Sequence, residues 1–501
     1  MIPLLTRQAV RDIDRHAIDV LGVSGIALME NAGAGATRFF LERHRERRDG
    51  VVIVGGVGQN GGDGWVLARH LLVSGIEAKC LLVGAREKVT GDALVNLKAL
   101  EALGCAVQTV GDPAALAQQL QGAQVLVDGL FGTGLDRVIT GLYEAVIHAL
   151  NASLLPIFSL DLPSGIHADT GQVLGVAVRA QQTATFAARK RGLEQYPGVE
   201  QAGEVRCVSI GVPVPVAAPC GLITKQDVAQ AVPSRAGDAH KGSAGHVLVV
   251  GGGAGRTGAA LLCALGAQRA GAGLVTIASD TATRAALDHK VLEAMTAELG
   301  AEDELASALR YAKGKRSAVV GPGLGLSESR KRLARDLAAQ LPCATVLDAD
   351  ALTAQAGVAE GLRNALAPRI LTPHPAEAAR LLECDVATVQ ADRYGAAAAL
   401  SERTGQVAVL KGARTVIAAP DGRLRVCGFG TQALASGGTG DVLAGVIAAL
   451  AGSLPAFEAA WAGAALHALS GERAATGDRG LLASEVAAAL PAALLDCRVR
   501  A

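Results

Sequence analysis

Hydrophobic residues in the first half of the chain fall into short continuous runs, and each run is followed by a glycine-rich or polar turn and a helical stretch. Short runs without polar alternation are typical of strands that are buried on both faces. Helices between such strands predict a parallel sheet covered on both sides. Thr6 is expected to cap a first helix, and a second helix is expected over residues 26–41. Strands are predicted at residues 51–54, 78–83, 125–127, 156–160 and 205–209.

A second series of strands and helices begins near residue 246, after a break in the pattern. The segment 211–219 contains three prolines, and so many prolines make a stiff connector. We therefore expect two α/β domains, residues 1–215 and residues 222–501, with different motifs and without an internal repeat. A capping box is expected at residues 224–227. In this series, strands are predicted at residues 246–250, 274–278, 318–320, 344–347, 369–371 and 407–410.

Composition and charge narrow the classes of function. The 501 residues carry 47 basic and 47 acidic side chains and only 3% aromatic residues, so neither charge nor base stacking favours nucleic acid as a partner. Apolar runs stay well short of the roughly 20 residues that cross a membrane, and the N-terminus does not resemble a signal peptide. The nine cysteines never form a CxxC pair and the ten histidines lack metal-ligand spacing, so we expect a cytoplasmic protein with reduced thiols.

One glycine-rich stretch, residues 435–445, indicates an anion site. Its sequence is ASGGTGDVLAG, and the apolar run that follows has the pattern of a helix, so the glycines are expected at a helix N-terminus. Backbone N–H groups and the helix dipole bind phosphoryl groups in such a place. Asp441 has two interpretations: a helix cap, or a base that takes a proton from a hydroxyl attacking phosphorus. We favour the base, because the chain has no GxxxxGK[ST] loop to hold phosphate elsewhere.

Polar side chains stand at the ends of three predicted strands in the first half. Gln59, Asn60 and Asp63 belong to the loop GVGQNGGDG, before a helix expected from Trp65 to Ser74, and Asp128 and Asp161 close two later strands. The carboxyl ends of parallel strands meet at one crevice, so we expect these groups to converge, although each alone is also a common turn cap. A cluster that offers only oxygen ligands suits a hard monovalent or divalent cation.

Two GxGxxG matches keep a dinucleotide-dependent dehydrogenase open. The match at residues 56–61 lacks an acidic residue at the end of the next strand, whereas the match at 253–258 has Asp280 there. Three later features favour phosphoryl transfer instead. They are a bare-backbone loop at residues 321–325, His374 between two prolines at a strand end, and Lys411 beside a glycine. A plain turn role for His374 is equally open.

Taken together, these motifs resemble a known family. The second half is similar to ADP/ATP-dependent NAD(P)H-hydrate dehydratases, which have a ribokinase-like fold, in the motifs HKGSAGHVLVVGG, GPGLG, TPHPAE, LKGART and GGTGD. The first half resembles NAD(P)H-hydrate epimerases, which have a Rossmann-like parallel sheet, in GVGQNGGDG, VDGLFGTGL and DLPSG. The resemblance covers nearly the whole chain and implies a fused, bifunctional enzyme that repairs hydrated nicotinamide nucleotides.

The resemblance also implies the chemistry. NAD(P)H slowly adds water across C5 and C6 of its ring, and dehydrogenases cannot use the resulting R and S hydrates. The epimerase would interconvert the two forms, and the dehydratase would return the S form to NAD(P)H at the expense of ADP or ATP, with Mg²⁺. Phosphorylation of the C6 hydroxyl would convert a poor leaving group into a good one.

For the first half, the resemblance implies a hydrate site and a potassium site. Asp161 would shuttle a proton, and K⁺ would bind to Asn60, Asp128 and Ser164. Gln59 stands where the family usually has asparagine, and it keeps the amide group on a longer side chain. The hydrate-binding set would be Gln59, Asn60, Gly61, Gly62, Asp63, Gly132, Thr133, Gly134, Leu135, Asp136, Arg137, Val138 and Asp161.

For the second half, the resemblance implies that Asp441 is the base. The family motif usually has glycine at position 376, and Ala376 adds only a methyl group. The hydrate would contact Ala259, Gly323, His374 and Asp441, and the nucleotide would contact Lys411, Gly412, Ala413, Arg414, Thr415 and Gly440.

Two other functions stay open beside the dehydrogenase: a ribokinase-like small-molecule kinase, and a nucleotide-binding protein without catalysis. A kinase would release a stable phosphorylated product, which distinguishes it from the dehydratase. The expected partners are NADH hydrate, NADPH hydrate and ADP or ATP, and we expect a homo-oligomer. The sequence does not decide between ADP and ATP or between NAD and NADP.

Overall fold

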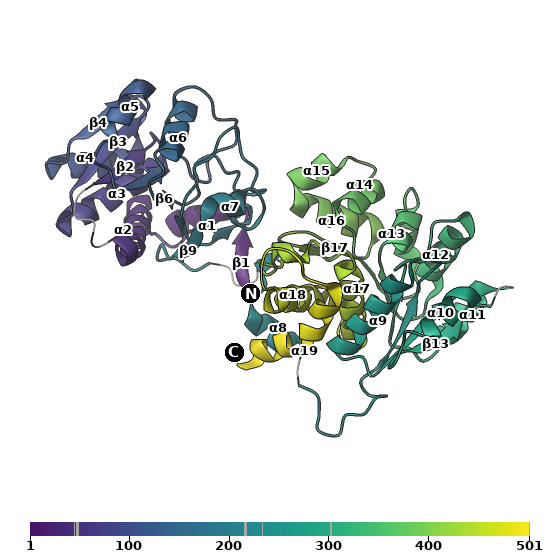
Figure 1. Cartoon of the computed structure of the whole chain (residues 1–501). Helices are drawn as coiled ribbons and strands as arrows, with labels where there is room; N and C mark the ends of the chain where they lie inside the picture. Colours follow the sequence, from purple (N-terminus) through teal and green to yellow (C-terminus); the bar gives the residue numbers. More distant parts are fainter. Residues whose placement is uncertain (45, 47–49, 215–217, 233, 301–302, 500–501) are drawn as a thin grey trace. The chain divides into compact units, whose positions relative to one another are not determined.

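The computed structural model describes residues 1–44, 46, 50–214, 218–232, 234–300 and 303–499 (Figure 1). Two compact units are present: Pro3–Ala218, and Pro219–Ala501 together with Met1–Ile2. The division falls inside the proline-rich segment 211–219, of which residues 215–217 lie outside the described part.

The first unit is built on a seven-stranded parallel sheet in the order β4-β3-β2-β5-β6-β7-β9. The predicted strands are confirmed, and two were missed because polar residues interrupt them: β4 has the sequence VQTV and β7 has QTATF. A short strand β1 (Ile2–Leu5) pairs with β8 (Arg189–Lys190). The sheet strands are β2 (Val51–Gly55), β3 (Ala78–Val83), β4 (Val107–Val110), β5 (Val125–Gly129), β6 (Ile157–Leu160), β7 (Gln182–Phe186) and β9 (Glu204–Val208).

Helices cover both faces of this sheet. Strand β2 shows why: Val51 and Ile53 point into one hydrophobic core, and Val52 and Val54 point into the other. The first core is closed by α1 (Arg7–Asp19), α2 (Gly25–His44), α3 (Gln59–Val73) and α4 (Gly91–Ala102), and the second by α5 (Pro113–Gln119) and α6 (Leu142–Ala152). Thr6 caps α1 by accepting from the Ala9 N–H, as predicted.

The prediction that the helix begins at Trp65 is wrong, because α3 already begins at Gln59. Glycines permit this early start, because without side chains they let the first turn of α3 pack directly against neighbouring atoms. A Cβ on Gly61 would lie 2.0 Å from the carbonyl oxygen of Gly56, and a Cβ on Gly55 would lie 2.6 Å from the Trp65 ring. The first two turns of α3 therefore carry Asn60 and Asp63 directly into the space beyond the strand ends.

The second unit contains the sheet β13-β12-β11-β14-β15-β16-β17-β18-β19-β10, parallel from β13 to β17 and antiparallel over β17-β18-β19. All six predicted strands are confirmed, and four further strands, β10, β13, β18 and β19, were not predicted. The strands are β10 (Cys220–Leu222), β11 (His246–Val250), β12 (Leu274–Ser279), β13 (Met295–Glu298), β14 (Ser317–Val320), β15 (Ala344–Leu347), β16 (Arg369–Leu371), β17 (Val407–Leu410), β18 (Val416–Ala418) and β19 (Leu424–Val426).

Alanine and glycine set the packing of the second unit. Helices α9 (Thr257–Ala270) and α17 (Thr439–Ala451) approach so closely that a Cβ on Gly445 would lie 2.0 Å from the Cys263 carbonyl oxygen. Helices α18 (Ala456–Ala474) and α19 (Ala483–Val499) complete that core. The predicted capping box is present at the start of α8 (Lys225–Ala231). The remaining helices are α7 (Gly198–Ala202) in the first unit and α10 (Thr281–Asp288), α11 (Glu304–Ala312), α12 (Glu328–Gln340), α13 (Asp350–Ala354), α14 (Pro375–Leu382), α15 (Val386–Ala391) and α16 (Arg393–Thr404) in the second.

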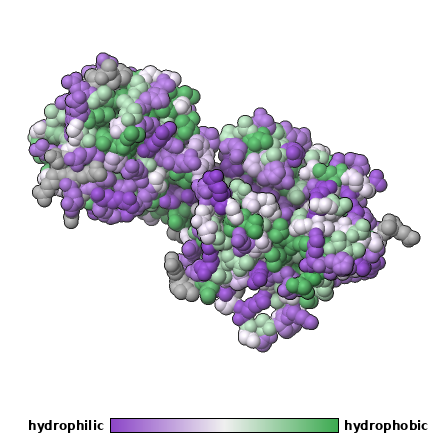
Figure 2. All heavy atoms as spheres, viewed as in Figure 1, coloured by the Kyte–Doolittle hydropathy of each residue, from purple (hydrophilic) through white to green (hydrophobic). Residues whose placement is uncertain are grey.

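The surface is mixed in character. Hydrophilic and hydrophobic side chains are interspersed on the face shown in Figure 2. None of the helices in the described ranges has both the length and the hydrophobicity to cross a membrane.

Candidate active sites

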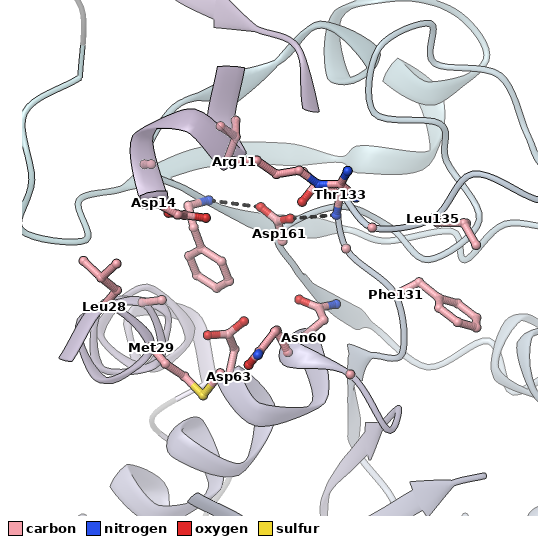
Figure 3. Close-up of a pocket in the computed structure, with 18 of the residues that line it drawn as sticks. Arg11, Asp14, Leu28, Met29, Asn60, Asp63, Phe131, Thr133, Leu135 and Asp161 are labelled. Atoms are coloured by element: carbon pink, nitrogen blue, oxygen red, sulfur yellow. Dashed lines mark hydrogen bonds between the residues drawn. The ribbon is translucent and has the colours of Figure 1, made fainter. Parts of the chain in front are cut away.

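A cavity of about 660 Å³ opens in the first unit at the carboxyl ends of β2, β5 and β6 (Figure 3). Its volume lies in the range of small-molecule sites. Polar groups come from the segments that follow these three strands, and helices α1 and α2 supply the opposite, partly apolar wall. The predicted residues that line it are Gln59, Asn60, Asp63, Gly132, Thr133, Gly134, Leu135, Asp136, Arg137 and Asp161, together with Val10, Arg11, Asp14, Leu28, Met29, Phe186 and Lys190, among others.

Asp161 lies at the centre of the polar wall. It follows β6 directly and adopts a left-handed backbone conformation, with φ of 64°, which a non-glycine residue adopts only where the surroundings enforce it. The Lys190 ammonium donates to Oδ1 at 2.5 Å, and the Thr133 N–H donates to Oδ2 at 3.1 Å (Figure 3). The carboxylate is therefore held between a buried cation and the loop that follows β5.

Two further carboxyl groups share this cavity. Asp63 points into it from α3, and Asp14 approaches from α1 (Figure 3). Burial raises the pKa of Asp63 well above its usual range, and the nearby Asp161 and Asp14 add to the rise, while Lys190 opposes it. Burial likewise raises the pKa of Asp14, and Lys190 again opposes the shift. The cavity thus favours a neutral carboxyl at Asp63 facing Asp161.

The predicted cation ligands take different positions. Asn60 donates from its side chain to the Leu160 carbonyl, while its buried Oδ1 has no hydrogen-bond partner within the described part of the chain. Asp128 is fully buried behind the cavity wall, where burial raises its pKa. Its two oxygens accept from Ser164 Oγ at 2.6 Å and from Ser164 N and Ser159 Oγ at 2.8 Å. The unpaired Asn60 oxygen fits a cation, whereas the two oxygens of Asp128 are already bonded and clamp the Ser164 turn.

Some predicted residues serve packing rather than the cavity wall. A Cβ on Gly61 would meet the Gly56 carbonyl, and a Cβ on Gly62 would lie 2.7 Å from the Met29 sulfur. Val138 is 61% exposed and does not line the cavity. Gly132, by contrast, lines the cavity and must be glycine to fit beside Asp161, because a Cβ there would lie 2.8 Å from Asp161 Oδ2.

In the second unit, the GGTGD motif forms the start of α17, as the sequence predicts. Gly438 is the N-cap residue, with φ of 90°, and Asp441 lies in the first turn. The first-turn N–H groups of a helix have no carbonyl partners within that helix, so they can bind an anion. Burial, with help from the negative charge of Asp348, raises the pKa of Asp441 to about 6. A carboxylate with such a pKa is well suited to accept a proton near neutral pH.

Lys411 and the buried Asp348 form a partly buried ion pair beside this helix start. Lys411 Nζ lies 2.8 Å from Asp348 Oδ1, and Thr372 donates to the same oxygen, also at 2.8 Å. Lys411 also lies near Gly440, because a Cβ on Gly440 would be 3.5 Å from Nζ. Glu377 Oε2 is 3.9 Å from Nζ, and burial raises the pKa of Glu377 to about 7. A cation and three acidic groups thus surround the predicted phosphate position.

The structure also places the other predicted residues of this unit. His374 is the N-cap of α14, where its Nδ1 accepts from the Ala376 and Glu377 N–H groups. Gly323 packs against Ala259, since a Cβ on Gly323 would lie 3.3 Å from the Ala259 Cβ. In the loop after β17, Thr415 Oγ1 donates to the Gly412 carbonyl and Arg414 has φ of 58°; Ala413 lies between them.

Asp280, the acidic residue at the strand end on which the dehydrogenase interpretation depended, caps a helix. Its carboxylate caps α10 by accepting from the Thr283 N–H at 2.9 Å and also accepts from Thr283 Oγ1 at 3.0 Å. Arg330 lies 3.4 Å from its second oxygen.

Some polar residues of the two sites were not predicted, among them Asp348, Glu377, Asp14 and Lys190. Asp348 directly follows β15, the same strand-end signal that identified Asp128 and Asp161, so the sequence could have indicated it. Glu377 stands within TPHPAE, but its raised pKa depends on burial. Asp14 and Lys190 come from α1 and β8, far along the chain from Asp161, and only the fold brings them to the cavity.

Known proteins resemble this chain in both halves. Residues 25–192 match the family model described as YjeF-related protein N-terminus, and residues 247–491 match the one described as NAD(P)H-hydrate dehydratase. The bifunctional NAD(P)H-hydrate repair enzyme Nnr of Thermofilum pendens is 40% identical over 98% of this chain and 95% of its own length. The enzyme of the same name from Escherichia coli K12 is 34% identical over 95% and 91% of the two chains.

A solved structure supports the fold of the second unit. A ribokinase-like superfamily protein of Enterococcus faecalis matches with a TM-score of 0.50 and 26% identity, over 56% of this chain and 96% of that protein. The full-length matches in sequence cover both units. This chain belongs to the family of bifunctional NAD(P)H-hydrate repair enzymes.

Proposed function

We propose that the first unit epimerises the R and S hydrates of NADH and NADPH, and that the second unit dehydrates the S form with ADP or ATP. The single observation that carries the dehydratase is Asp441, with its pKa of about 6, in the first turn of a helix whose N–H groups adjoin Lys411. Residues 1–215 and 222–501 are the proposed domains. The strand-end cavity around Asp161 supports the epimerase.

For the dehydratase, the proposed first step is phosphorylation of the C6 hydroxyl of the hydrate. Asp441 takes the hydroxyl proton, and the oxygen attacks the terminal phosphorus of the nucleotide. The N–H groups at the start of α17 and the Lys411 ammonium stabilise the charge on the transferred group. The ring nitrogen lone pair then expels phosphate, and loss of the C5 proton restores the double bond. With ADP, the products are NAD(P)H, AMP and phosphate.

The resemblance to the family supports the remaining contacts of the dehydratase site. We assign the hydrate to Ala259, Gly323, His374 and Asp441, and the nucleotide to residues 411–415 and Gly440. Mg²⁺ bound with the nucleotide would screen the phosphate charges, and Glu377 and Asp348 offer the carboxylates for it. Within the described ranges, no three His, Cys, Asp or Glu side chains form a metal cluster.

For the epimerase, Asp161 is the proposed proton shuttle. In its protonated form it gives its proton to the C6 hydroxyl, which leaves as water when the ring nitrogen lone pair expels it. The carboxylate so formed takes a proton back when water adds to the other face of the ring. Gln59, Asn60, Asp63 and the loop 132–138 would hold the hydrate around this carboxylate, while the packing of Gly61 and Gly62 shapes the start of α3. K⁺ is assigned to Asn60, Asp128 and Ser164, supported by the unpaired Asn60 oxygen.

Product analysis tests the proposal. The protein is incubated with S-NADH hydrate and ADP, and in parallel with ATP, and the nucleotides are separated by chromatography. Formation of NADH and AMP in equal amounts from ADP supports the dehydratase. A stable phosphorylated hydrate without NADH would support a kinase instead. Sedimentation of the same sample would show whether the expected homo-oligomer forms.

A further inference from the structure

Lys190 is a buried cation that belongs to no predicted site. It is fully buried in β8, and its ammonium has three acceptors: Asp161 Oδ1 at 2.5 Å, Phe186 O at 2.7 Å and Thr185 Oγ1 at 3.0 Å. An ammonium group has three N–H donors. All three are therefore committed within the protein, so Lys190 has no donor left for a ligand in the cavity.

The two carboxylate oxygens of Asp161 have different hydrogen-bond partners. Oδ1 faces the protein interior, where it accepts from Lys190 and, at 3.4 Å, from the Phe186 N–H. Oδ2 lies toward the cavity-lining loop, where it accepts from the Thr133 N–H and adjoins Gly132. The interior contacts therefore decide which oxygen faces the cavity.

Lys190 offsets the repulsion among the acidic groups at this cavity. Asp14, Asp63 and Asp161 lie at the same cavity, with Arg11 and Arg137 on its wall. Lys190 lowers the pKa of both Asp14 and Asp63, against the effect of burial and of Asp161. Without Lys190, the Asp161 carboxylate would stand beside two other acidic groups with no buried cation bonded to it.

We propose that Lys190 is a positioning residue of the epimerase: it clamps Oδ1 of Asp161 so that Oδ2 is presented to the C6 hydroxyl. The inference rests on the proposed role of Asp161 as proton shuttle. It assigns to Lys190 an effect on turnover rather than on substrate binding, since the ammonium makes no contact that the substrate could replace.

The test uses the full chain and a mixture of R and S NADH hydrates with ADP. Recovery of absorbance at 340 nm then has two phases: the S fraction reports the dehydratase, and the later R fraction reports the epimerase, after subtraction of spontaneous epimerisation. Lys190→Ala should lower the kcat of the R phase about 100-fold or more, with KM changed less than about threefold. The S phase serves as an internal control and should not change.

Chemical rescue separates positioning from a merely structural role. Ethylammonium should restore part of the R phase of Lys190→Ala, because it can fill the space left by the side chain with a cation. Ethanol, which is neutral, should not. Lys79→Ala is the matched control, since Lys79 is a partly buried lysine of the same unit whose ammonium bonds to the Gln119 carbonyl. It should leave both phases unchanged.

A milder variant keeps the proposal testable if Lys190→Ala does not fold. Thr185→Val removes one acceptor of the ammonium and keeps the charge, and it should lower the R-phase kcat several-fold. Full R-phase activity in Lys190→Ala or Thr185→Val, with Asp161→Asn inactive, would overturn the role of Lys190 and leave the proton shuttle at Asp161 intact. Full activity in Asp161→Asn would overturn the proposed proton shuttle itself. Loss of activity in Lys190→Ala that ethylammonium and ethanol restore equally would also contradict the clamp.

Discussion

The ammonium of Lys411 lies 2.8 Å from Oδ1 of Asp348, and this partly buried pair sets the charge around the proposed phosphate position. Asp348 raises the pKa of Asp441, whereas Lys411 lowers it, and burial is the largest cause of the overall rise. The pKa of the proposed base therefore depends on two neighbours that act in opposite directions. The predictions for the dehydratase follow from this arrangement.

The first prediction concerns pH. Asp441 must be ionised to accept a proton, and its pKa is about 6, so kcat/KM for the S hydrate should fall as pH decreases through about 6 and level off above it. Lys411→Met removes a charge that lowers this pKa, so the acid limb should move to higher pH by roughly one unit. Steady-state rates between pH 5 and 8 measure both. An unchanged limb in Lys411→Met would contradict the assignment.

Glu377 is the control for that experiment, because its pKa of about 7 also lies in this range. Glu377→Gln should retain the limb near pH 6. If this variant lost the acid limb of the pH profile, the limb would report the ionisation of Glu377 and not of Asp441.

The second prediction concerns Asp441 itself. Asp441→Asn should lower dehydration at least about 100-fold, because the amide cannot accept the hydroxyl proton, while ADP affinity by calorimetry stays within about threefold. Asp421→Asn is the matched control, since Asp421 is an exposed carboxylate of the same unit paired with Arg423. If Asp441→Asn lost ADP binding and dehydration together, Asp441 would be a nucleotide ligand rather than the base.

The third prediction concerns the epimerase. Asp161→Asn should slow conversion of R to S hydrate about 100-fold or more, and dehydration of pure S hydrate should be unchanged. Chiral separation of the two hydrates over time gives the rate. Asp12→Asn, at an exposed residue of α1, is expected to behave as the wild type. Full epimerase activity in Asp161→Asn would show that Asp161 is not the proton shuttle.

The fourth prediction concerns stability. Arg369 is fully buried in β16, where its guanidinium donates to the carbonyls of Ala338 at 2.5 Å, Leu341 at 2.8 Å and Cys343 at 3.1 Å, at the C-terminal end of α12. Burial lowers its pKa to about 10. Arg369→Met would leave these carbonyls without their donor, so the free energy of unfolding of the second unit should fall by about 3 kcal/mol.

The two tryptophans allow this to be measured in the intact chain. Trp65 lies in the first unit and Trp461 in the second, so in a Trp65→Phe background urea unfolding followed by fluorescence reports the second unit. Arg335→Met, which removes an exposed arginine bonded to the Ala354 carbonyl, should cost less than about 1 kcal/mol. Equal losses in the two variants would contradict the role of Arg369.

The sequence predicted most of the fold because its strands are continuous apolar runs. It failed where polar residues interrupt the apolar pattern of a strand, as in β4 and β7. It also placed the start of α3 too late, because the glycines of GVGQNGGDG indicated a loop while their actual role is to let the first turns of the helix touch neighbouring backbone.

The sites divide in the same way. Groups at strand ends, such as Asp161, could be placed near the cavity from topology alone, since parallel strands bring their carboxyl ends together. Lys190 could not, because its contact with Asp161 spans 29 positions and depends on the pairing of a two-residue strand. The pKa of Asp441 likewise follows from burial and from Asp348, neither of which a motif reveals.

The most direct test of the bifunctional assignment is recovery of absorbance at 340 nm from a mixture of R and S NADH hydrates. With ADP or ATP, the whole mixture should return to NADH, faster than spontaneous epimerisation allows, and nothing should return without nucleotide. Recovery that stops at the S fraction would contradict the epimerase, and no recovery with either nucleotide would contradict the dehydratase.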